Sequence, residues 1–149
     1  MAKGRSSSGT YDVLLLCEYI IDYYRDYNKP ITHIRLEGLL YFIQAWFLAQ
    51  LDKPCFQEFI EARESSPVVM KVKEKYSSYG AHSIPFDKDA AQLELEKEDE
   101  KVLNDVLSYT LNWTDVEMSR IIHSQKPFTS ALDSFSRVID TQKLKKYFR

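Results

Sequence analysis

Ser119 and His123 are the two residues whose types and spacing come closest to catalytic chemistry in this chain. They are four positions apart, so on a helix both side chains would share one face, where a histidine can take the proton of a serine hydroxyl. Such a pair also needs a third group that orients the histidine, and neither residue stands in a hydrolase motif. An enzyme built on this pair is therefore the last of three functional hypotheses.

Other kinds of chemistry are harder to assemble from the sequence. His33, His82 and His123 are isolated from one another, and Cys17 and Cys55 lie in apolar surroundings without a histidine at ligand spacing. The four glycines do not form a phosphate-binding loop. The sequence therefore predicts a non-enzymatic protein with no metal, nucleotide or other cofactor.

The charge of the chain gives it little general attraction to polyanions. The formal net charge is −2, so any contact with nucleic acid or an anionic membrane would have to be local. A basic block near the C-terminus comprises Lys143, Lys145, Lys146 and Arg149. We interpret this block as favouring the dipole of a last helical turn. Acidic pairs such as Asp99 with Glu100, or Asp12 with Glu18, are interpreted as solvated faces.

Apolar residues at helical spacing predict the elements that would position these groups. A first amphipathic helix is predicted at residues 10–27. A second helix, at residues 32–49, has Thr32 as its N-cap and is apolar on nearly every side. We therefore expect this second helix to lie in the core, Trp46 included.

The middle of the chain shows signals for both strand and helix. Residues 56–62 and the surroundings of Ile84 are predicted as two short extended segments. Ser66 followed by Pro67 is typical of a helix start, and we expect that helix to end near Gly80. Any sheet in this protein should therefore be small.

Two further helices are predicted from their caps. Thr114 and Glu117 match the capping box, which predicts a short helix running to His123. Asp140 or Thr141 is expected to cap a final basic helix. The predicted fold class is mainly α, a compact helical bundle with at most a minor two-stranded β element.

The 149 residues are most simply one domain. We expect a flexible lead at residues 1–9 and a single helical domain at residues 10–149. No apolar run is long enough to span a membrane, and both cysteines look like buried thiols. The expected location is therefore the cytoplasm, with no membrane partner.

The order of several short motifs points to a known family. Residues 30–46 read PITHIRLEGLLYFIQAW, residues 61–69 read EARESSPVV, and residues 118–128 read MSRIIHSQKPF. This series resembles the Panacea domain family, also called SocA-like or DUF4065, which includes many phage-associated proteins. The resemblance covers about residues 11–132. Gly38 stands where lysine is usual in the family, and the tryptophan and glycine of the second block are missing.

The resemblance implies an antitoxin-like role. Members of the family lie beside diverse toxins and neutralise them, and a related member delivers its toxin to a protease. The family is not known for an enzymatic activity of its own. The leading hypothesis is therefore a phage- or prophage-associated protein-binding module whose partner is a toxin encoded nearby, with a protease as a second partner if it acts as an adaptor.

The resemblance also suggests where a partner would bind. The second helix is mostly apolar and should serve as scaffold, so the less regular segments are better candidates for recognition. The candidate partner-binding residues are Glu61, Arg63, Ser66, Pro67, Ser119, His123, Pro127 and Phe128. The alternative function is a nucleic-acid-binding regulator of a phage or toxin–antitoxin operon, using residues 32–46 or the basic C-terminus. The apolar character of residues 32–46 argues against it.

Overall fold

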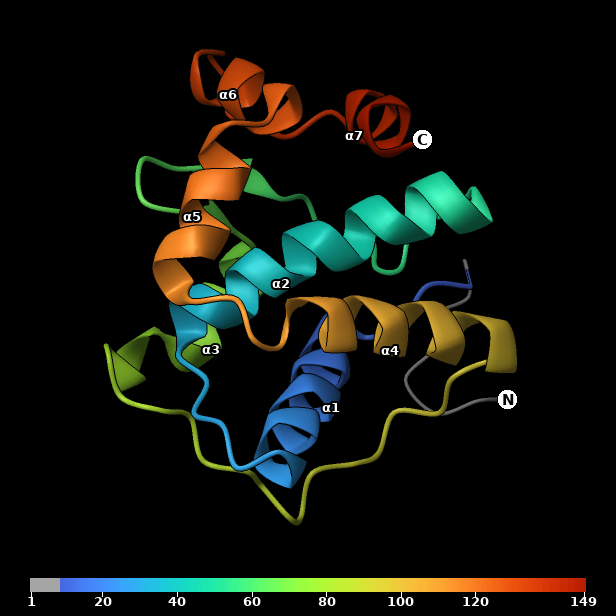
Figure 1. Ribbon diagram of the computed structural model, residues 1–149, viewed down its shortest axis with the longest axis vertical. Coiled ribbons are helices and arrows are strands. Elements are labelled where there is room, and N and C mark those ends of the chain that lie inside the picture. The colour runs from blue at the N-terminus through green and yellow to red at the C-terminus, as the bar shows by residue number, and fades with distance from the viewer. Residues whose placement is uncertain (1–8) are drawn as a thin grey trace.

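The computed structural model describes residues 9–149, so the predicted lead at residues 1–9, apart from Gly9, lies outside the described residues. Within that range the chain forms seven α-helices, two short strands, one π-helical turn and one 3-10 turn (Figure 1). The elements are α1 (Val13–Asp26), α2 (His33–Trp46), η1 (Phe47–Leu51), β1 (Glu61–Ala62), β2 (Pro67–Val68), α3 (Met70–Tyr76), η2 (Ser77–Tyr79), α4 (Lys97–Thr110), α5 (Asp115–His123), α6 (Lys126–Leu132) and α7 (Thr141–Phe148). The predicted mainly α fold class is confirmed.

Helix α2 forms the centre of the molecule (Figure 1). It begins where the Thr32 hydroxyl accepts a hydrogen bond from the backbone N–H of Arg35 at 3.3 Å, as an N-cap should. Helices α3, α4, α5 and α7 and strand β2 all contact it. Such surroundings require apolar residues on every side of the helix, which is the pattern that the sequence shows. Trp46, at its C-terminal end, is only partly buried.

The two strands form a hairpin where a helix start was predicted. Strands β1 and β2 pair antiparallel, with Ala62 opposite Pro67, and the Arg63 N–H donates to the Ser66 carbonyl at 3.1 Å. Helix α3 therefore begins only at Met70, and the predicted start at Ser66 and Pro67 is wrong. Proline lacks an N–H and suits the edge of so small a sheet as well as a first helical turn, so the local signal was ambiguous.

The other strand predictions were only partly right. Of residues 56–62, only the last two form a strand. Ile84 is not in a strand, although its N–H donates to the Ile31 carbonyl at 2.8 Å. A third segment joins the hairpin instead, because Glu61 forms an isolated antiparallel bridge with Val138 from the chain before α7. Because Val138 is remote in sequence from Glu61, no local sequence pattern could predict this pairing.

The capping predictions for α5 and α7 are confirmed. The Thr114 hydroxyl accepts from the Glu117 N–H, and the Glu117 carboxylate accepts from the Thr114 N–H, both at 3.0 Å. At the start of α7, the Asp140 carboxylate accepts two backbone N–H groups. These signals succeed because both partners of a cap lie within one helical turn.

Two carboxylates that were predicted to be solvated are buried instead. Asp99 has no exposed surface, and it accepts from the Tyr11 hydroxyl at 2.5 Å and pairs with Lys53 at 2.9 Å. Glu18 is also buried and accepts from the Tyr76 hydroxyl at 2.7 Å. Each of these carboxylates is buried together with a donor from a distant segment, which compensates part of its desolvation.

Candidate functional site

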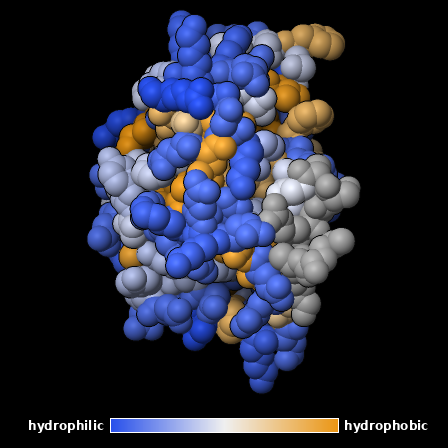
Figure 2. Space-filling model, turned by 90° about the vertical axis from the view of Figure 1, so that its right-hand side faces the viewer, coloured by the Kyte–Doolittle hydropathy of each residue, from blue (hydrophilic) through white to orange (hydrophobic). Residues whose placement is uncertain are grey.

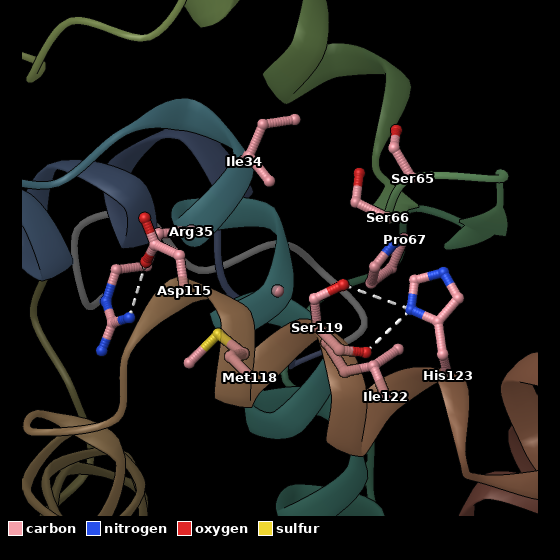
Figure 3. A pocket seen from close by; sticks show the side chains of 11 residues that line it. Ile34, Arg35, Ser65, Ser66, Pro67, Asp115, Met118, Ser119, Ile122 and His123 are labelled. Carbon is pink, nitrogen blue, oxygen red and sulfur yellow. Dashed lines mark hydrogen bonds and ion pairs between the residues drawn. The ribbon is translucent and has the colours of Figure 1, made fainter.

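A small pocket lies between α2, α5 and the turn that joins β1 to β2 (Figure 3). Its volume is about 30 Å³, enough for one or a few water molecules and too little for a metabolite. The residues that line it are Ile34, Arg35, Gly38, Ser65, Ser66, Pro67, Asp115, Met118, Ser119, Ile122 and His123. We call it the α2–α5 pocket.

Gly38 sets the distance between α2 and α5. A Cβ atom at this position would lie 2.9 Å from Met118 Sδ and 3.5 Å from Ile122 Cδ1, and the first distance is closer than side chains normally approach. Glycine therefore allows α5 to pack tightly across α2. The sequence showed only that no charged side chain stands at position 38. The structure shows that a larger residue there would meet Met118 and Ile122 of α5.

Arg35 closes one end of the α2–α5 pocket. Its side chain is only 6% exposed. It donates to Asp115 at 2.8 Å, to the Tyr24 hydroxyl at 2.9 Å and to the Thr110 carbonyl at 2.9 Å. The guanidinium thus joins α1, the end of α4 and the start of α5, a geometry that its several fixed N–H donors permit.

His123 closes the other end. Its Nδ1 lies 2.7 Å from the Ser119 carbonyl and its Nε2 lies 2.8 Å from the Glu64 carbonyl. Both carbonyl oxygens can only accept, and which ring nitrogen donates is set by the tautomer of the imidazole. The His123 side chain therefore fastens the β1–β2 turn to the C-terminal end of α5.

The contact between Ser119 and His123 is long for an activated nucleophile and its base. The Ser119 hydroxyl is 3.4 Å from His123 Nδ1 (Figure 3), but that nitrogen already faces the nearer Ser119 carbonyl. The predicted spacing does place both side chains on one face of α5. Nucleophilic catalysis also requires a third group that orients the histidine, and the Nε2 contact here goes to a backbone carbonyl and not to a carboxylate.

The eight candidate partner-binding residues divide between pocket, hairpin and core. Ser66, Pro67, Ser119 and His123 line the α2–α5 pocket. Glu61 and Arg63 lie beside it on the hairpin, half-buried and paired at 2.7 Å. The two others, Pro127 and Phe128, are buried at the start of α6.

Phe128 links this region to the core. Its ring has no exposed surface and lies 4.8 Å, centroid to centroid, from the His123 ring. Ser66 is buried too, and its hydroxyl has no hydrogen-bond partner among the described residues. Four of the eight side chains, those of Ser66, Pro67, Pro127 and Phe128, are thus buried, so they can shape a binding surface but not present themselves on it.

Sequence reasoning missed the charged residues of α2. Glu37 is 1% exposed at its side chain and accepts from the Val69 N–H at 2.6 Å. Burial raises the pKa of its carboxyl from 4.5 to about 7, although the Val69 N–H and Lys73 both lower that pKa. The nearby His33 has its pKa lowered by burial and by Lys73. Charged residues inside an otherwise apolar helix were the available signal for Arg35 and Glu37.

The described part of the chain was searched for metal-ligand clusters and for membrane-spanning helices. Among residues 9–149, no group of three His, Cys, Asp or Glu side chains is placed to hold a metal ion. In the same range, no helix combines the length and the apolar character that a bilayer span would need.

Fold and site together define a small helical protein whose pocket side chains bind one another and the backbone. A profile of the antitoxin SocA-like, Panacea domain matches residues 36–128, which is more than half of the chain, so this protein belongs to that family. No curated protein and no solved structure matches it. The match runs from α2 into α6, whereas α1 and α7 lie outside it.

Proposed function

We propose that this protein is a non-enzymatic antitoxin that acts in the cytoplasm by stoichiometric binding of a protein toxin. The observation that carries the proposal is the match of residues 36–128 to the antitoxin SocA-like family. The position of His123 supports it, because the two ring nitrogens lie 2.7 and 2.8 Å from backbone carbonyl oxygens of the chain. The toxin is encoded nearby, on a phage or prophage, and is either blocked directly or handed to a protease. Residues 10–149 act as one domain.

The β1–β2 hairpin and the end of α5 form one candidate contact surface for the toxin. Glu61, Arg63, Ser119 and His123 are partly exposed there. The Nε2 contact to the Glu64 carbonyl ties the two elements together. A partner bound across them would meet a surface that is already ordered, which lowers the entropic cost of association.

The alternative of a nucleic-acid-binding regulator receives little support from α2. A recognition helix needs an exposed polar face, but residues 35–45 of α2 are all buried. Within the basic C-terminal block, Lys145 and Arg149 pair with Asp52 at the end of η1. A regulatory function would therefore have to use another part of the surface.

The test is co-expression with the product of the adjacent gene. We expect that gene alone to stop growth and this protein to restore it, with the two proteins copurifying at a fixed ratio. An adaptor would also lower the toxin level in wild-type cells but not in cells that lack the protease. Growth arrest that persists despite full expression of this protein, together with failure of the two to copurify, would overturn the proposal.

A further inference from the structure

A groove between α6 and α7 differs from the α2–α5 pocket in both its size and the charge of its lining. It is lined by Lys126, Pro127 and Ser130 of α6 and by Lys143, Lys146 and Tyr147 of α7, and we call it the lysine groove. Its volume is about 370 Å³, within the range of cavities that hold ligands. Several side chains of a partner would fit into it.

The helix dipoles do not explain the positions of two of the three lysines. Lys126 is the first residue of α6 and Lys143 is the third residue of α7. A positive charge near a helix N-terminus opposes the helix dipole. The dipole interpretation of the basic block suits Lys146, in the last turn of α7, but not Lys126 or Lys143.

Ion pairs within the chain do not explain them either. Lys145 and Arg149, on the same helix, pair with Asp52. In contrast, the three groove lysines are exposed and form no ion pair with any residue of the described range 9–149. No carboxylate lines the groove. In a chain of net charge −2, three such cations around one hollow create a local positive potential.

The floor of the groove is apolar. Pro127 is buried, and the Tyr147 ring is 49% exposed and lies 5.5 Å from the Phe148 ring. The face that carries the end of α7 is otherwise mainly hydrophilic, with hydrophobic side chains confined to a narrow band and a few spots (Figure 2). An apolar floor inside a charged rim is the usual anatomy of a protein-binding site.

We propose that the lysine groove binds a partner-protein segment in which carboxylates flank an apolar side chain. Carboxylates would pair with the lysines, and the apolar side chain would pack on the exposed Tyr147 ring, above the buried Pro127. A nucleic acid backbone would satisfy the lysines but leave this floor uncovered. The inference rests on the proposed function in taking the partner to be a protein. Because α7 lies outside residues 36–128, the groove is not contained in the family match.

A direct test uses the full chain labelled with ¹⁵N and a capped hexapeptide of sequence Asp-Glu-Leu-Phe-Glu-Asp. We expect saturable amide shifts confined to residues 126–130 and 143–147, and weaker binding at higher salt. The isosteric peptide Asn-Gln-Leu-Phe-Gln-Asn should shift these amides at least about tenfold more weakly, since it lacks the charges.

A matched pair of variants locates the binding. The triple variant K126Q/K143Q/K146Q should weaken peptide binding by about tenfold or more. The control K75Q/K88Q/K97Q removes the same charge from exposed lysines elsewhere and should bind like the wild type. Absence of groove shifts with the acidic peptide, equal effects of both triple variants, or stronger groove shifts with a DNA duplex would each overturn the proposal.

The growth assay separates this inference from the proposed function. If wild-type protein restores growth and K126Q/K143Q/K146Q does not, the groove contacts the toxin. If both restore growth equally at matched expression, the groove inference fails and the antitoxin function stands. If neither does, the proposed function fails, while the peptide titration still decides whether the groove binds acidic segments.

Discussion

The α2–α5 pocket and the lysine groove differ in how their charged side chains are paired. In the pocket, Arg35 donates to Asp115 and to the Thr110 carbonyl, and the His123 ring contacts two backbone carbonyls. In the groove, three lysines surround an apolar floor and pair with nothing in the described part of the chain. The first arrangement stabilises the fold, whereas the second leaves charge available to a partner.

This difference shows why pocket chemistry alone is a poor guide to function here. Ser119 and His123 have the residue types of a catalytic pair, yet their polar atoms serve the packing of α5 against the hairpin. The lysines of the groove belong to no catalytic motif, and the positions of Lys126 and Lys143 do not stabilise their helices. Substitutions in the two regions should therefore separate into effects on folding and effects on binding.

Phe128→Ala should give the largest effect, because this ring fills space between the two regions. We expect it to lower the free energy of unfolding by about 4 kcal/mol through lost burial and a cavity, as measured by urea denaturation. Phe135→Ala is the matched control, since Phe135 is fully exposed and should change stability by less than about 0.5 kcal/mol. Similar effects of both substitutions would contradict the assignment of Phe128 to the core.

Arg35→Met tests whether the pocket charges are structural. Loss of the guanidinium leaves the Tyr24 hydroxyl without its donor and removes one of the two donors of the Thr110 carbonyl, which keeps the Trp113 N–H. We therefore expect a loss of about 3 kcal/mol. Asp115 is 61% exposed, and Asp115→Asn should cost no more than about 1 kcal/mol. If Arg35→Met were neutral in stability but lost toxin binding, the pocket would be a binding site after all.

Glu37→Gln should alter how the free energy of unfolding depends on pH, with a largest difference close to that expected for Arg35→Met. Because burial raises the folded-state pKa of Glu37 to about 7, its contribution is complete below about pH 4.5 and is lost as the pH rises through 7. At about 1.4 kcal/mol per pKa unit, the variant should gain up to about 3 kcal/mol on the wild type above pH 8 and nothing below pH 4.

Thermal or urea denaturation between pH 4 and 9 measures the difference in stability between Glu37→Gln and the wild type at each pH, which gives a difference curve. Glu74→Gln, on the exposed surface of α3, is the control and should run parallel to the wild type. The comparison is repeated in a His33→Gln background, because His33 Nδ1 lies 3.9 Å from the Glu37 carboxylate. A flat difference curve for Glu37→Gln in both backgrounds would refute the raised pKa.

Gly38→Leu tests the close approach of α5 to α2. The added side chain would meet Met118 and Ile122, and overpacking of this kind costs about 2 kcal/mol. Gly38→Ala should be nearly neutral, because the gain in helix propensity, at most about 1 kcal/mol, offsets a small shift of the flexible Met118 side chain. The double variant Gly38→Leu with Met118→Ala should recover part of the loss, and no recovery would contradict the proposed contact.

The smallest effect on folding is expected in the lysine groove. K126Q/K143Q/K146Q should change the free energy of unfolding by less than about 0.5 kcal/mol, because these side chains are exposed and two of them oppose a helix dipole. Urea denaturation beside the peptide titration measures both properties on one sample. A large loss of stability would make the lysines structural and erase the contrast between the two regions.

Local signals predicted those features whose physical partners are close in sequence. The capping box at Thr114 and the cap at Asp140 are right because donor and acceptor lie within a single turn. The predicted helix start at Ser66 is wrong because Pro67 pairs with Ala62 in the hairpin, where proline is also tolerated. The same hairpin is joined by Val138, a partner remote in sequence. Asp99 was misplaced for the same reason, since Tyr11, its hydroxyl donor, is 88 positions away.

The sequence by itself determined a mainly helical, apolar-centred protein, the N-caps of α2, α5 and α7, and a family resemblance carried by residues 30–128. Only the tertiary structure decided which polar groups are paired with other groups of the chain. His123 Nε2 contacts the Glu64 carbonyl across 59 positions, and the lysine groove exists only because α7 packs beside α6. Helix periodicity reports on neighbours three and four positions away, whereas the partner of a charged group is set by how whole elements meet in space.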